Sequence, residues 1–284
     1  MAIMLSGDFD PDEAIQLIDQ NFGYYQSRDV IPYEPPTEAP LTKVTERSIY
    51  GPEAEGVMIG YRYPGTASDD ARILEVIDLL LSNSSAGLFD LNLNLQQKVR
   101  SAYSSPMALR DYSVHMLFGS PREGQSLEEV RDLLLAQIEM IKNGEFEEGM
   151  LRAIVNNTQI EKMERYESNY GRTSEFVEAF TTGQDWSDYI QRLPKMREIT
   201  KDDIVRIANE YYKDNYVIVY KRKGERTSAK VVKPEITPVS VNRESRSPFL
   251  ASIVDAEPPR LQPRFLNYDE DIQKSSLKGY KGPA

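Results

Sequence analysis

The sequence contains no cysteine and a single histidine, His115, among its 284 residues. Without cysteine the chain forms no disulfide, offers no thiolate to a metal and has no thiol nucleophile. Secreted and cytosolic origins therefore both stay open. One imidazole cannot supply the two histidines of a His-x-x-Glu-His helix, so we expect no zinc site built from this chain alone.

Long apolar runs and the common catalytic loops are absent as well. No run of about 18 apolar residues occurs, so we expect no transmembrane segment. The first seven residues lack the basic region and the apolar length of a signal peptide, and residues 3–5 are predicted to form a short strand. The motifs Gly-x-x-x-x-Gly-Lys-Ser/Thr, Gly-x-Gly-x-x-Gly and Gly-x-Ser-x-Gly do not occur, so phosphate cradles and nucleophile elbows have no support.

The overall composition indicates a folded, acidic protein. Hydrophobic residues make up 40% and charged residues 28% of the sequence, which is typical of globular chains. The formal net charge of -11 repels nucleic-acid phosphates and anionic lipid surfaces. We therefore expect no nucleic-acid partner.

The spacing of apolar residues and of capping residues predicts an α+β fold. Asp10 before Pro11, and Ser126 three residues before Glu129, are typical of helix starts. Strand pairs alternate with helices, which indicates an antiparallel or mixed sheet with helices packed on one face. The predicted elements are a helix over 10–22, strands over 43–50 and 56–63, helices over 68–81 and 86–97, strands over 99–104 and 110–118 joined by a turn at Ser105-Pro106, helices over 126–143, 145–181 (broken near 169–172) and 200–211, and a strand over 216–221.

Three stretches could carry chemistry, and each has a simpler interpretation. His115 lies in a predicted strand with no acid–base triad around it, so we interpret it as a packed or surface histidine and not as a base or ligand. The acidic residues 7–13 lack the spacing of a calcium loop and are explained by helix capping, with Glu13 completing a capping box. Residues 268–271 are interpreted as solvated linker. No catalytic, cofactor-binding or metal-binding residue is assigned.

Two further features leave alternatives open. The charged residues of 145–168 favour a solvent-facing helix surface with pairs at i,i+4 spacing. Four tyrosines in predicted strands favour sheet packing over peptide contact. These are Tyr61, Tyr63, Tyr103 and Tyr112.

Proline-rich stretches indicate the domain organisation. Residues 31–42 hold four prolines and are predicted to be a linker after the end of a preceding domain over 1–30. Residues 43–225 then form the α+β domain. Residues 226–284 have seven prolines and few helix signals, which predicts an extended linker. We expect the chain to be a piece of a longer protein.

Several segments, in their order along the chain, resemble the pitrilysin/insulinase-type zinc peptidases. The strand-to-helix junction Met4-Leu5-Ser6-Gly7-Asp8-Phe9-Asp10-Pro11 leads into a helix that ends at Phe22-Gly23. It is followed by the strand 56–64, the strand entry Gln97-Lys98-Val99-Arg100-Ser101-Ala102-Tyr103, and the closing helix and strand over 200–221. The resemblance covers roughly residues 1–225.

The resemblance implies a non-catalytic role for this chain in a zinc peptidase. The family's zinc-binding His-x-x-Glu-His helix lies in its first domain, and this chain is similar to the second domain of the N-terminal half plus the linker between the halves. Zinc is then expected in the preceding domain and none in this segment. The partners implied are the other domains of the same polypeptide and peptide substrates.

The family encloses peptides in a chamber between two halves, so this segment is expected to form part of the chamber wall, with helix 145–168 as one candidate lining. The alternatives are a structural or assembly subunit without proteolytic activity, as in respiratory complexes, and a free-standing peptide-binding protein. A homo-oligomer stays open. The linker looks like those of bacterial proteins, which suggests that the protein is located in a bacterial periplasm or cell envelope.

Overall fold

The computed structural model describes residues 2–31, 33–225, 235, 237–256, 265 and 267. The chain divides into two compact units, residues 1–228 and 229–284. In the described part of the second unit, α9 (Pro248–Val254) is capped by Ser247, whose Oγ accepts the amide of Leu250 at 3.1 Å. The predicted linker segment 268–271 lies outside the described residues.

A five-stranded mixed sheet forms the centre of the first unit. The strand order is β1-β5-β2-β4-β3, with β1 and β5 parallel and the other neighbours antiparallel. The α+β class with an antiparallel or mixed sheet is therefore confirmed. The strands are β1 (Thr45–Gly51), β2 (Gly56–Pro64), β3 (Ser101–Met107), β4 (Tyr112–Ser120) and β5 (Val217–Lys223).

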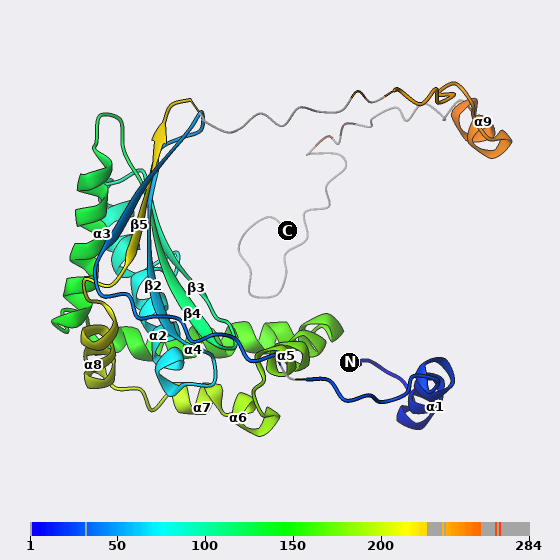
Figure 1. Cartoon of the computed structure of the whole chain (residues 1–284), viewed down its shortest axis with the longest axis horizontal. Helices are drawn as coiled ribbons and strands as arrows, with labels where there is room; N and C mark the ends of the chain where they lie inside the picture. The colour runs from blue at the N-terminus through cyan, green and yellow to red at the C-terminus, as the bar shows by residue number, and fades with distance from the viewer. Residues whose placement is uncertain are drawn as a thin grey trace. The chain divides into compact units, whose positions relative to one another are not determined.

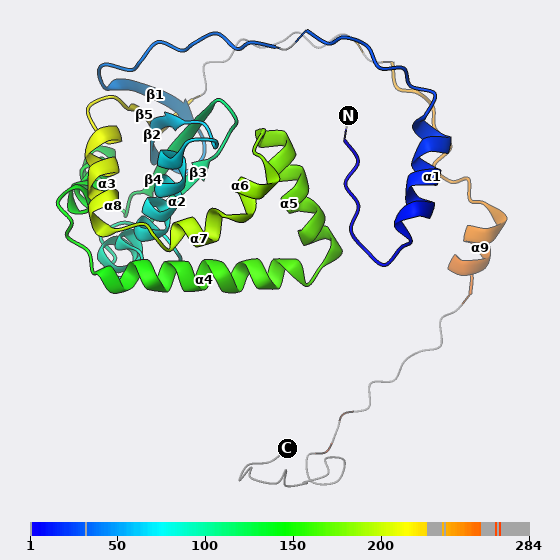
Figure 2. The same ribbon diagram turned by 90° about the horizontal axis from the view of Figure 1, so that it is seen from below.

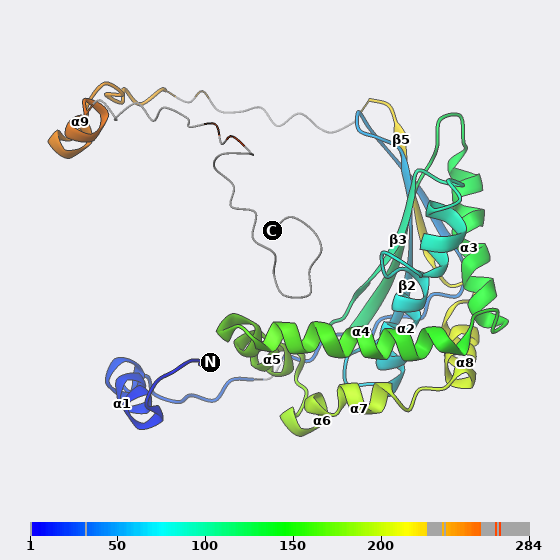
Figure 3. The ribbon, with the colours of Figure 1, turned by 180° about the vertical axis from the view of Figure 1, so that it is seen from behind.

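Helices pack on one face of this sheet, as predicted. Figures 1 and 3 show α2 (Asp69–Leu81), α3 (Leu127–Lys142) and α8 (Lys201–Tyr211) on the same side. Every second residue of β2 and β4 is buried against them, because side chains alternate between the faces of a strand. The core contains Ile59, Leu80, Leu117, Leu134 and Ile207, each fully buried.

Capping side chains set where α3 and α8 begin. Ser126 Oγ accepts the amide of Glu129 at 3.2 Å, and Glu129 Oε2 accepts the amide of Ser126 at 3.0 Å. Thr200 and Asp203 form the same reciprocal capping box at α8. The Thr200 hydroxyl also lowers the pKa of the Asp203 carboxyl. Both starts lie where the sequence predicts them.

Two predicted details of the chain between α2 and β4 are wrong. The helix expected over 86–97 is reduced to the π-helical turn η1 (Asp90–Asn94), because the Asn94 side chain pairs with the backbone N–H and C=O of Ala102 at 2.7 and 2.8 Å. The turn expected at Ser105-Pro106 lies inside β3 instead. That strand is at the edge of the sheet, where proline is tolerated.

The N-terminal segment also departs from its prediction. Residues 2–6 form no strand, because a strand needs a hydrogen-bonded neighbour and none pairs with them among the described residues. In α1 (Pro11–Phe22), Asp10 Oδ1 accepts the amides of Asp12 and Glu13 at 2.8 and 3.0 Å, but the described hydrogen bonds do not include the return bond from Glu13.

The apolar side of α1 is exposed. Ile15, Leu17 and Phe22 are 60%, 52% and 41% exposed, and no residue of the helix is buried. The reason is that no described element packs on this side. None of the helices in the described part of the chain combines the length and apolarity needed to cross a membrane.

The close approach of β4 to α3 yields a stability prediction. A Cβ at Gly119 would lie 2.4 Å from Val130 Cγ1 and 3.1 Å from Leu134 Cδ1, both on fully buried side chains. We expect Gly119→Ala to lower the free energy of unfolding by about 2 kcal/mol, because β4 and α3 must move apart. Urea denaturation measures this, with Gly51→Ala as the control, since a Cβ there meets nothing within 4 Å. Equal stability of the two variants would contradict the packing.

Candidate functional site

The single histidine lies inside the core, between the sheet and two helices. His115 on β4 is 0% exposed. Its Nε2 is 2.9 Å from Asp78 Oδ1 on α2, and its Nδ1 is 2.6 Å from the hydroxyl oxygen of Tyr212, which caps α8. Asp78 and Tyr212 are themselves buried. The three side chains form a bridge that we call the core bridge.

The direction of the hydrogen bonds in the core bridge follows from its chemistry. A carboxylate only accepts, so Nε2 of His115 carries a proton and donates it to Asp78. Burial raises the pKa of Tyr212 well above its ordinary value, so its hydroxyl stays protonated and can donate to Nδ1. Both ring nitrogens are therefore bonded to protein groups.

These residues do not fit a zinc ion. A zinc ligand must offer a free imidazole, thiolate or carboxylate lone pair, and the chain has one imidazole and no thiolate. That imidazole has no free nitrogen. Within the residues that the structure describes, no three histidine, cysteine, aspartate or glutamate side chains are grouped so that they could hold a metal.

A second feature is a helical arm made of four consecutive helices. They are α4 (Glu148–Tyr166), α5 (Asn169–Thr182), α6 (Trp186–Ile190) and α7 (Arg192–Met196). Figure 2 shows α4 along one side of the unit, α5 turning away from its end, and α6 and α7 leading back towards α2. The break after Tyr166 lies close to the one predicted. Gly183 ends α5 with a φ of 69°, a left-handed conformation that favours glycine.

Three adjoining cavities follow the inner side of this arm, and together we call them the arm cleft. The apolar cavity has a volume of about 680 Å³, the charged cavity about 530 Å³ and the inner cavity about 140 Å³. The apolar and charged cavities share Lys162, Glu175 and Leu193 in their walls; the charged and inner cavities share Glu75, Pro106 and Arg192.

Large side chains line the apolar cavity and remain partly open to solvent. Met163, Phe176 and Trp186 are 63%, 38% and 40% exposed. The rings of Phe176 and Trp186 lie with their centroids 4.5 Å apart, and Trp186 stacks on Tyr189 at 5.5 Å. This part of the arm cleft therefore presents aromatic surface from α5 and α6.

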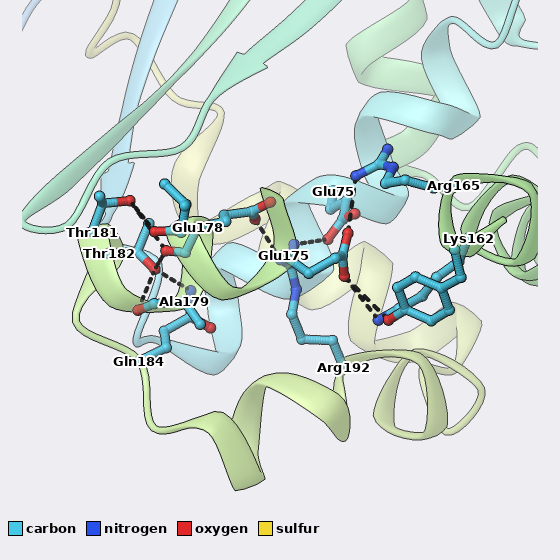
Figure 4. A network of polar contacts seen from close by, with 12 residues as sticks. Glu75, Lys162, Arg165, Glu175, Glu178, Ala179, Thr181, Thr182, Gln184 and Arg192 are labelled. Carbon is cyan, nitrogen blue, oxygen red and sulfur yellow. Dashed lines mark hydrogen bonds and ion pairs between the residues drawn. The ribbon is translucent and has the colours of Figure 1, made fainter. Parts of the chain in front are cut away.

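Ion pairs organise the charged cavity. Arg192 joins two helices, with Nη2 2.9 Å from Glu75 Oε2 on α2 and Nη1 2.8 Å from Glu178 Oε1 on α5 (Figure 4). Burial alone would lower the pKa of Arg192, but the charges of these two glutamates outweigh it and raise the pKa. Arg192 therefore stays charged and fixes α7 between α2 and α5.

Glu175 is the most deeply buried carboxylate of the arm, at 4% exposure. Its Oε1 is 3.1 Å from Arg165 Nη1, and its Oε2 is 3.5 Å from Lys162 Nζ and accepts the Tyr166 hydroxyl at 3.3 Å (Figure 4). These partners offset the cost of burying the charge.

The charged cavity favours positively charged ligand groups. Five carboxylates and three cations line it, an excess of two negative charges. Its carboxylates are Glu75, Asp78, Glu161, Glu175 and Glu178, and its cations are Lys162, Arg165 and Arg192. Burial, followed by the charges of Glu178 and Glu175, raises the pKa of Tyr189 in the same wall, so its hydroxyl stays neutral.

No local sequence pattern indicates the arm cleft. Arg192 and Glu75 are 117 positions apart, and no local pattern brings them together. Part of the helix predicted over 145–168 does line the cleft, through Thr158, Glu161, Lys162 and Arg165. The only sequence signal was the density of charge on that helix, which a solvent-facing surface explains equally well.

The four strand tyrosines divide between the core and the surface. Tyr61 and Tyr63 are 2% and 1% exposed. Tyr103 is 51% exposed and stacks on Phe118 with ring centroids 4.6 Å apart. Tyr112 accepts the amide of Glu38 at 3.2 Å and so contacts the proline-rich segment before β1. The core packing of Tyr61 and Tyr63 extends the apolar face of β2.

Comparison with known proteins identifies the family. The family described as "Peptidase M16 inactive domain" matches residues 1–158, more than half of the chain. The chain belongs to the M16 peptidase family. The resemblance to pitrilysin/insulinase-type peptidases is thereby confirmed, and the M16 match is to the inactive, non-catalytic type of domain.

One relative is a bacterial zinc protease. The zinc protease PqqE of Helicobacter pylori (strain ATCC 700392 / 26695) is 25% identical over 221 residues, which cover 75% of this chain and 49% of the relative. This M16 chain thus spans about half the length of that curated relative.

Solved structures share the fold of this M16 domain. A protease from Helicobacter pylori superposes with a TM-score of 0.71 at 22% identity, covering 76% of this chain and 54% of that one. The first half of the periplasmic protease PqqL from Escherichia coli superposes with a TM-score of 0.60 at 13% identity, covering 76% and 49%. At these identities the likeness concerns the fold.

The ion pairs of Glu175 yield a second stability prediction. We expect Glu175→Ala to lower the free energy of unfolding by about 2 kcal/mol, because Lys162 and Arg165 lose a buried partner but keep access to solvent. Glu164→Ala on the exposed side of α4 is the control and should change stability by less than about 0.5 kcal/mol. Chemical denaturation of both variants measures the difference. If they are equally stable, Glu175 does not hold the arm.

Proposed function

We propose that this chain is the non-catalytic second domain in the first half of a longer zinc-dependent M16 peptidase. The observation that carries the proposal is the placement of His115, because the only imidazole of the chain is bonded on both nitrogens inside the core. The match to the inactive-domain type of the family supports the same role. In this proposal zinc belongs to the domain that precedes this one.

The proposed layout keeps the boundaries expected from the proline pattern. Residues 1–30 complete the preceding domain, 31–42 link it to the domain over 43–225, and 226–284 connect the two halves. The exposed apolar side of α1 supports this layout, because Ile15, Leu17 and Phe22 then pack on the preceding domain. The partners of the chain are thus the other domains of its own polypeptide.

The domain would contribute part of the wall of a chamber that encloses peptides. The arm cleft supports this role, since its aromatic and charged side chains offer the contacts that peptides make. Hydrolysis would take place at the zinc-activated water of the preceding domain, and this segment would supply shape and binding contacts. A bacterial periplasm or cell envelope is the proposed location, in line with the periplasmic PqqL structure.

Peptide hydrolysis by the full-length protein tests this proposal. The full-length protein and the 284-residue chain are each incubated with a quenched fluorescent peptide library, with and without a zinc chelator. We expect cleavage by the full-length protein, loss of cleavage with chelator, recovery on adding zinc, and no cleavage by the 284-residue chain.

Two outcomes would contradict the proposal in different ways. Cleavage by the 284-residue chain alone would show that a catalytic centre lies within it. A full-length protein that is folded but inactive towards every peptide, and whose sequence lacks His-x-x-Glu-His, would favour the structural or assembly subunit. The matched control is the full-length protein with the first histidine of that motif replaced by alanine.

A further inference from the structure

The inner cavity of the arm cleft contains buried hydroxyl groups without partners. Ser113, on the helix-facing side of β4, is 1% exposed, and Thr66 lies in the loop between β2 and α2. Within the described part of the chain, neither Ser113 Oγ nor Thr66 Oγ1 has a hydrogen-bond partner. A buried hydroxyl without a partner is unfavourable, so such groups normally mark bound solvent or a ligand.

The charges around this cavity favour an anion. Arg72 and Arg192 line it, with Glu75 as its one carboxylate, an excess of one positive charge. The adjoining charged cavity has the opposite sign. Arg192 is held by Glu75 and Glu178. Arg72 is freer, because its described bonds use one nitrogen, Nη1, which is 2.7 Å from the exposed Asp69.

The size and the walls of the cavity narrow the class of anion. A volume of about 140 Å³ excludes nucleotides and other large ligands. Leu74 and Ala108 line it beside the polar groups, so one side of the ligand is apolar. A carboxylate suits the planar fork of an arginine, whereas phosphate has no apolar side to place against Leu74.

We propose that the inner cavity binds the C-terminal carboxylate and the short aliphatic side chain of a peptide, with Arg72, Ser113 and Thr66 as hydrogen-bond donors. The rest of the bound peptide then extends towards the charged cavity, whose excess of carboxylates attracts the positively charged amino end of the peptide. The choice of a peptide as the ligand rests on the proposed function. The assignment of a carboxylate rests on the cavity alone.

Titration of the ¹⁵N-labelled 284-residue chain by NMR tests the site. The probes are the dipeptide L-Ala-L-Ala, its C-terminal amide, acetate and inorganic phosphate. We expect the dipeptide to shift the amide signals of 71–75 and 113, and the amide form to bind at least about tenfold more weakly, because it loses the charge-assisted bonds to Arg72.

Substitutions in the wall of the inner cavity test whether the dipeptide binds there. Ser113→Ala and Arg72→Met should each weaken dipeptide binding about tenfold while the spectrum stays that of the folded chain. Among the described contacts, Ser113→Ala removes a hydroxyl without a partner and Arg72 pairs only with the exposed Asp69, so we expect both variants to fold. The controls are Ser101→Ala on β3 and Arg47→Met on β1, which lie outside the arm cleft and should bind normally.

The outcomes separate this inference from the proposed function. Any one of four results would overturn the site. The dipeptide and its amide bind equally, or phosphate binds more tightly than the dipeptide. Alternatively, Ser113→Ala and Arg72→Met leave the affinity unchanged, or no probe binds. Binding of acetate but not of the dipeptide supports the carboxylate site and overturns the peptide. If the 284-residue chain binds the dipeptide but the full-length protein does not hydrolyse peptides, the site is supported and only the proposed function is overturned.

Discussion

The core bridge between Asp78, His115 and Tyr212 is the interaction on which the account depends. It joins α2, β4 and α8 through one imidazole that is closed to solvent. The same two hydrogen bonds that fix these three elements occupy both nitrogens of the only histidine in the chain. Structure and function are therefore linked at this residue, because a buried ring whose two nitrogens are both bonded to protein groups offers no free lone pair to a zinc ion.

The helical arm forms the arm cleft, whose walls present partly exposed aromatic and charged side chains. Its ion pairs run from Glu75 through Arg192 to Glu178, and from Glu175 to Lys162 and Arg165, and they fix the helices that surround the arm cleft. The sign of charge changes along the cleft, from an excess of carboxylates in the charged cavity to an excess of arginine in the inner cavity. A surface with this polarity can orient a zwitterionic chain such as a short peptide.

Local patterns predicted most of the fold. The capping boxes at Ser126 and Thr200 and the alternation in β2 act between neighbouring residues, so they can be read from one segment. The errors arise where the local conformation is set by contacts with other parts of the chain. Asn94 pairs with the backbone of Ala102 and shortens a predicted helix, while Pro106 is accepted because β3 is an edge strand. The arm cleft depends on such distant contacts throughout, which is why no sequence pattern reveals it.

The most direct test of the central claim is the ¹⁵N–¹H NMR spectrum of the side chain of His115 in the labelled 284-residue chain, recorded with and without added zinc. A single histidine makes the signals unambiguous. The account predicts a ring protonated at Nε2, with Nδ1 accepting the Tyr212 hydroxyl, and signals that zinc does not change. A ring protonated at Nδ1 alone, or signals that move in proportion to bound zinc, would contradict it.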